Sequence, residues 1–123
     1  MSRLLQALLV IAPMVFSGTA QAEGYSRLTD RDAFVSLVAG RDLVLPFFGS
    51  ASSLNPSDMI GGAAQGAPIS GEWGWKDGYF CRTMRGGSME IPANCQTVEV
   101  KDGARLRFTT DQGQGRSATF VLN

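Results

Sequence analysis

The sequence predicts a single α+β domain that is mainly β, with one N-terminal helix packed on a twisted antiparallel meander. Three observations support this class. The length of 123 residues suits one domain. One segment alone has the apolar spacing of an amphipathic helix. The rest consists of short segments with turn signals roughly every 8 to 12 residues, which predicts about five to seven strands. Such a meander can also curl into a half-open barrel.

Residues 1–22 have the pattern of an export signal. Arg3 precedes the apolar run Leu4–Phe16, and Ala20-Gln21-Ala22 is a small-residue cleavage site. The run is too short for a bilayer of about 30 Å, so it does not predict a transmembrane anchor. We therefore expect a periplasmic or secreted protein whose mature part, residues 23–123, is one disulfide-linked domain with no membrane span after cleavage.

The helix is expected over residues 28–40. Phe34, Leu37 and Val38 form an i, i+3, i+4 stripe. Thr29 suits the N-cap position, and Gly40 suits the position just after the last turn. The apolar stripe needs a partner surface, which the predicted sheet supplies.

The segments that follow the helix have weak strand character. Residues 43–48 are apolar but contain Pro46, which favours an edge strand or a bent one. Residues 49–58 are rich in serine and turn formers and are expected to be a loop. Residues 59–71 are rich in glycine and alanine, which predicts a narrow strand against which another backbone packs closely.

The second half of the chain has clearer strand patterns. Asp77-Gly78 and Asp102-Gly103 are hairpin signals between alternating segments. The expected strands cover residues 72–76, 79–84, 95–100, 105–110 and 117–122. Period-two counting predicts that the core comes from even positions, namely Phe80, Val98, Val100, Leu106, Phe108, Phe120 and Leu122.

Cys81 and Cys95 are the only cysteines. In an exported chain an even number of thiols favours a structural disulfide. The two residues lie on either side of an expected hairpin, so a cross-strand bond is geometrically reasonable. Redox activity is not indicated, because the chain has neither C-x-x-C spacing nor a neighbouring histidine.

The first expected hairpin carries the candidate binding site. It concentrates five aromatic and cationic residues: Trp73, Trp75, Tyr79, Arg82 and Arg85. Both tryptophans share one strand face, and Tyr79 is expected to share it across the turn. An exposed aromatic face flanked by arginines suits a protein partner or a flat apolar ligand. The structural alternative is that the tryptophans are core residues against the helix.

Composition excludes several function classes. Without histidine the chain lacks the base of Ser-His-Asp catalysis and the usual ligand of catalytic zinc. Eleven basic and eleven acidic residues give no net charge for attracting nucleic acid. The glycine-rich segment 61–66 is not followed by a helix, as a phosphate-binding loop requires. The sequence therefore predicts no catalytic residue, no metal site and no cofactor.

Four motifs resemble a group of small exported alphaproteobacterial proteins of unknown function: G-x-W-x-W-x-D-G-Y-F-C-R at Gly71–Arg82, I-P-x-N-C-Q at Ile91–Gln96, L-R-F at Leu106–Phe108 and D-x-G-x-G at Asp111–Gly115. The resemblance covers the whole mature chain and implies no catalytic assignment. Some members are labelled dihydrodipicolinate reductase. The sequence does not support that label, because it lacks a dinucleotide-binding fingerprint and histidine.

The sequence thus favours a non-catalytic periplasmic binding or interaction module for an unknown protein or a small apolar ligand. One alternative is a carrier of a small hydrophobic molecule, which needs a cavity above about 300 Å³. Another is a carboxylate-dependent hydrolase that needs a carboxyl group in a cleft; its candidate residues are Glu72, Asp77, Glu90, Arg82 and Arg85.

Overall fold

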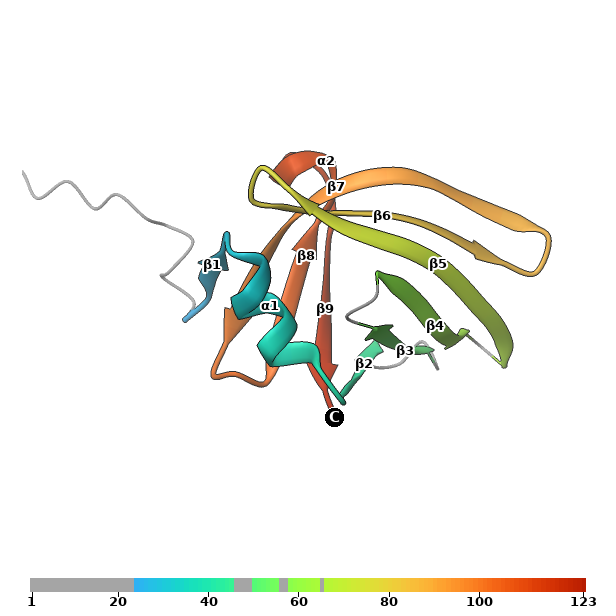
Figure 1. Ribbon diagram of the computed structural model, residues 1–123, viewed down its shortest axis with the longest axis horizontal. Helices are drawn as coiled ribbons and strands as arrows, with labels where there is room; N and C mark the ends of the chain where they lie inside the picture. Colours follow the sequence, from blue (N-terminus) through green and yellow to red (C-terminus); the bar gives the residue numbers. More distant parts are fainter. Residues whose placement is uncertain (1–23, 46–49, 56–57, 65) are drawn as a thin grey trace, which may run out of the picture.

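The main feature of the computed structural model is a closed antiparallel barrel (Figure 1). The structure describes residues 24–45, 50–55, 58–64 and 66–123, so the expected export signal lies outside the described residues. The strands are β1 (Ser26–Leu28), β2 (Asp42–Leu45), β3 (Ser50–Asn55), β4 (Met59–Ala64), β5 (Ala67–Lys76), β6 (Tyr79–Gly86), β7 (Met89–Lys101), β8 (Arg105–Thr109) and β9 (Ser117–Leu122). The helices are α1 (Arg31–Val38) and α2 (Thr110–Gly113).

Eight strands, β2 to β9, follow one another around the barrel, each antiparallel to the next. The ring closes where β2 pairs with β9, with Leu43 opposite Leu122 and Val44 opposite Val121. β1 adds outside the ring along β7. The mainly β prediction is confirmed. The half-open barrel and the count of five to seven strands are wrong, because the barrel is closed and two strands, β1 and β3, form where no strand was expected.

The middle of the chain, from β2 to β4, differs from the prediction. β2 is not an edge strand, because it pairs with β3 on one side and β9 on the other. Residues 46–49 lie outside the described residues. Instead of a loop, residues 50–55 form β3, whose serines and alanine join the ladders with β2 and β4. Small side chains have low strand propensity, and here closure of the barrel overrides it.

The glycine-rich segment behaves partly as expected. Instead of one narrow strand it forms β4 and the start of β5, paired to each other. The close backbone approach is confirmed, since a Cβ at Gly62 would overlap the Ala51 carbonyl group of β3. Gly62 also has a φ of 142°, which residues with side chains rarely adopt.

The helix α1 is shorter than predicted. Asp30, not Thr29, is the N-cap, and its Oδ2 accepts a hydrogen bond from the Ala33 amide at 3.1 Å. The Thr29 carbonyl group instead accepts a bond of 2.9 Å from Trp75 Nε1. Gly40 follows the helix with the expected positive φ of 71°. Neither helix in the described ranges has the length and apolar character needed to cross a membrane.

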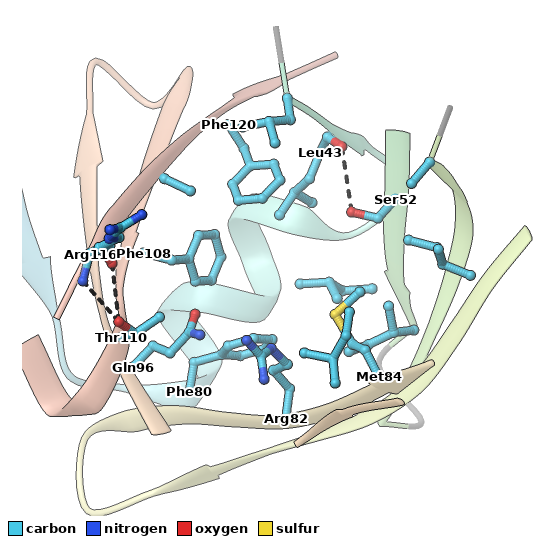
Figure 2. Close-up of a pocket in the computed structure, with 17 residues that line it drawn as sticks. Leu43, Ser52, Phe80, Arg82, Met84, Gln96, Phe108, Thr110, Arg116 and Phe120 are labelled. Carbon is cyan, nitrogen blue, oxygen red and sulfur yellow. Dashed lines mark hydrogen bonds between the residues drawn. The ribbon is translucent and has the colours of Figure 1, made fainter. Parts of the chain in front are cut away.

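α1 covers one end of the barrel. Arg31 pairs with Asp58 at the β3–β4 turn, and Arg41 donates to the Gly103 carbonyl group at the β7–β8 turn. Figure 2 looks into the barrel and shows α1 running across its far end. The helix therefore covers this end of the barrel.

The core forms where α1 meets the barrel. Phe34 is 0% exposed, and its ring contacts those of Trp73, Trp75, Phe80 and Phe108. The even-position prediction is confirmed: the buried members are Phe80, Val98, Leu106, Phe108 and Leu122, while Val100 and Phe120 pack against them partly buried.

The two hairpin turns predicted at Asp77-Gly78 and Asp102-Gly103 are confirmed. Asp77 and Gly78 have φ values of 53° and 83°, and Asp102 and Gly103 have 54° and 62°. Cys81 and Cys95 are direct partners on β6 and β7 and form the predicted disulfide. Such a bond is typical of proteins outside the reducing cytoplasm.

Candidate functional site

The barrel contains a cavity of about 350 Å³. Its walls are mostly aliphatic and aromatic side chains from all eight strands of the ring, and its polar members are Ser52, Arg82, Gln96, Thr110 and Arg116 (Figure 2). An eight-stranded barrel has an interior just wide enough for side chains to fill or for one small ligand. This barrel therefore combines a filled part with a hollow one.

Side-chain size explains why the hollow lies away from α1. At the α1 end the large rings of Trp73, Phe80 and Phe108 meet Phe34 and fill the section. The rest of the cavity wall includes Ala64 and Ala118, which occupy little volume. Phe80 and Phe108 belong to both parts, since they also line the cavity and form its floor.

Arg82 is the charged side chain placed most deeply in the cavity wall. It lies opposite Trp73 in the β5–β6 register, so both side chains are on the inner face of the barrel. Its Nη1 donates a hydrogen bond of 2.9 Å to the Pro92 carbonyl group on β7. Burial lowers the pKa of the Arg82 guanidinium through loss of hydration. No ion pair offsets this loss within the described residues.

Gln96 is a buried polar residue of the same wall. It is 6% exposed, and it pairs with Phe80 in the β6–β7 register, which places it on the inner face. Figure 2 shows its carboxamide group and the Arg82 guanidinium group both directed into the cavity. Within the described residues, the carboxamide group has no hydrogen-bond partner, so its donor and acceptor atoms are available to a ligand.

Thr110 and Arg116 lie at the edge of the cavity, where β8 ends and β9 begins. The Thr110 hydroxyl group accepts a bond of 2.9 Å from the Arg116 amide and donates one of 3.3 Å to the Arg116 carbonyl group. These bonds fix the backbone at the cavity edge, while Arg116 itself is exposed. Among the described residues that line the cavity, two are thus cationic and none is acidic.

The five predicted binding residues do not form one surface. Trp73 is 4% exposed in the core, and Trp75 is half-buried against Phe34, so both pack against α1 as in the structural alternative. The predicted sharing of a face with Tyr79 is wrong. In the register Tyr79 faces Lys76, whereas Phe80 faces Trp75, so the tyrosine lies on the outside, where Arg27 stacks on its ring at 5.1 Å.

The two arginines are also separated. Arg82 lines the cavity, whereas Arg85, three positions further along β6, is exposed beside a shallow surface pocket formed with Ser70 and Gly87. Successive side chains of a strand point to opposite faces, so two residues three positions apart lie on opposite faces of the sheet. Of the predicted site residues, only Arg82 lines the barrel cavity.

The three carboxylates of the hydrolase alternative are all solvent-exposed: Glu72, Asp77 and Glu90. None of them lines the cavity, so they do not provide the buried carboxyl group in a cleft that this alternative needs. In the described ranges no group of three or more potential metal-binding side chains gathers in one place.

Gln96 and Arg116 are cavity residues that were not predicted from the sequence. Both residues lie at even positions, which the period-two count had assigned to the inner face of the sheet. Gln96 is in phase with Val98, and Arg116 with Phe120, so an inward polar group could have been recognised there.

Comparison of the chain with protein-family models, with curated proteins and with solved structures gave no match. The site must therefore be interpreted from its own geometry.

Proposed function

We propose that this chain is a non-catalytic periplasmic binding protein that carries a small, mainly apolar molecule inside its barrel. The observation that carries the proposal is the cavity of about 350 Å³ with a largely apolar wall. Ligand sites start at about 300 Å³ and are mostly apolar with a few placed polar groups. The cavity meets the size that the carrier alternative requires.

The position of the aromatic residues favours the interior over the hairpin surface. A partner docking on the hairpin would need Trp73 and Trp75 to be accessible, but they pack against Phe34. Tyr79 and Arg85 stay on the outer face, without the tryptophans beside them. The carrier function therefore supersedes surface recognition as the first hypothesis for this domain.

The periplasm is the proposed compartment. The Cys81–Cys95 disulfide supports an oxidising environment. The export pattern of residues 1–22 supports secretion across the inner membrane.

Filling the cavity is expected to abolish binding. Ala118 faces the cavity from β9, so Ala118→Phe places a ring in the space that the ligand needs. With decan-1-ol as a neutral apolar probe, we expect 1:1 binding to the wild type and at least about tenfold weaker binding to the variant, because lost cavity volume removes apolar contact. Titration calorimetry measures both dissociation constants.

The control is Ala51→Phe, since Ala51 is exposed on β3 and its odd position faces outward. It should bind the alcohol like the wild type. Ala118→Leu, a smaller replacement, covers the case in which phenylalanine prevents folding. The proposal fails if the wild type does not bind the alcohol, or if both Ala118 variants bind it unchanged.

A further inference from the structure

The charge of the cavity wall defines the ligand more narrowly. Arg82 is a half-buried cation, and the described lining contains Arg116 as a second cation but no carboxylate. A buried charge is costly unless it is paired. The Pro92 carbonyl group satisfies one donor of Arg82, whereas a guanidinium group has five. An anion in the cavity would supply the missing charge and acceptors.

Gln96 is an independent second observation. Its side chain is more than nine-tenths buried, it faces the cavity, and no described residue bonds its carboxamide group. Because no side-chain N or O atom of the described residues is both fully buried and without a partner, the Gln96 amide atoms are open to the cavity and can bond a group inside it. A carboxylate on the ligand can accept one bond from the Arg82 guanidinium group and another from the Gln96 amide group.

The aliphatic part of the wall and the cavity volume indicate the character and size of the rest of the ligand. Leu54, Ile60 and Ile69 lie on β3, β4 and β5, away from the β7 strand that carries Gln96. At roughly 30 Å³ per water-sized group, a cavity of about 350 Å³ holds about twelve such groups. This is the size of a carboxylic acid with about ten carbon atoms.

We infer that the cavity selects an amphipathic acid: a medium-length apolar chain with one carboxylate, held by Arg82 and Gln96. This inference rests on the proposed function, because it assigns a chemical class to the ligand of the same cavity. Arg82 is a binding residue in this account, and its charge sets specificity rather than the existence of binding.

The test compares three probes of the same chain length: decanoate, decan-1-ol and decylamine, at pH 7.5. The wild type is expected to bind decanoate about tenfold to a hundredfold more tightly than the alcohol, as for a hydrogen bond to a charged group. The amine should bind more weakly than the alcohol, because its ammonium group faces the cations of the wall.

Arg82→Met is expected to bring the decanoate and alcohol dissociation constants to within about a factor of two, leaving alcohol binding in place. Arg82→Lys keeps the cation and should retain part of the preference. The matched control is Arg85→Met, which removes an equal charge from the exposed face of the same strand and should keep the full preference.

Two failures can be distinguished. If the wild type binds the alcohol but shows no preference for decanoate, or if Arg82→Met keeps that preference, the acid-selective site is wrong while the apolar carrier stands. If the wild type does not bind decan-1-ol, the carrier function itself is wrong, as stated for the proposed function.

Discussion

Phe34→Ala is expected to lower the free energy of unfolding by about 3–5 kcal/mol, the usual cost of removing a fully buried aromatic ring. Phe34 is 0% exposed and contacts four other aromatic rings. It is also the main attachment of α1 to the barrel, so the cavity left by alanine lies where the two parts meet.

Urea denaturation followed by tryptophan fluorescence measures this loss. Ser36→Ala on the same helix is the control, because Ser36 is exposed and alanine favours helix, so its stability should change by less than about 0.5 kcal/mol. A loss below about 1 kcal/mol for Phe34→Ala would contradict the packing of α1 against the barrel described above.

Removal of the disulfide is the second large effect. The double variant Cys81→Ala/Cys95→Ala is expected to lose about 3 kcal/mol, since the bond closes a loop of about 15 residues. The bond joins directly opposed positions of β6 and β7, and the same two strands carry Arg82 and Gln96 next to it. We therefore expect the loss of the bond to loosen the wall that holds the polar groups.

Denaturation with and without dithiothreitol checks this expectation. The wild type in reductant should fall to the stability of the double variant, and the variant should not respond to reductant at all. A wild type whose midpoint is the same under both conditions, with thiol titration showing complete reduction, would contradict a stabilising role for the bond.

Much of the second half of the fold could be predicted from local patterns. The hairpin turns at Asp77-Gly78 and Asp102-Gly103 need positive φ values, which aspartate and glycine tolerate, so these dipeptides mark their own positions. The alternation around Val98, Leu106 and Phe108 marks the buried face in the same local way.

The closed barrel could not be predicted this way, because it depends on contacts between distant segments. β3 consists largely of serine, alanine and asparagine and has no apolar alternation beyond Leu54. It is a strand because β2 and β4 offer unpaired backbone groups on either side. β2 stops being an edge only because Leu43 meets Leu122 at the far end of the sequence.

The candidate site was predicted in part. Arg82 was identified, but the tryptophans were placed together with Tyr79, because the face that pairs across a hairpin depends on the register. A two-residue turn pairs Lys76 with Tyr79, and this moves Tyr79 to the outside. The cavity itself depends on small side chains such as Ala64 and Ala118 in its wall, which come from distant segments, so no single segment reveals it.

The claim that the ligand lies inside the barrel is tested most directly by methyl NMR of protein labelled at the methionine methyl groups. Met84 lines the cavity, whereas Met59 and Met89 are 51% and 67% exposed on the surface. On titration with decanoate, we expect a saturable shift of the Met84 signal and intermolecular NOEs to the decanoate chain, with Met59 and Met89 unchanged. Shifts confined to Met59 or Met89, with Met84 unaffected at saturation, would contradict binding in the interior.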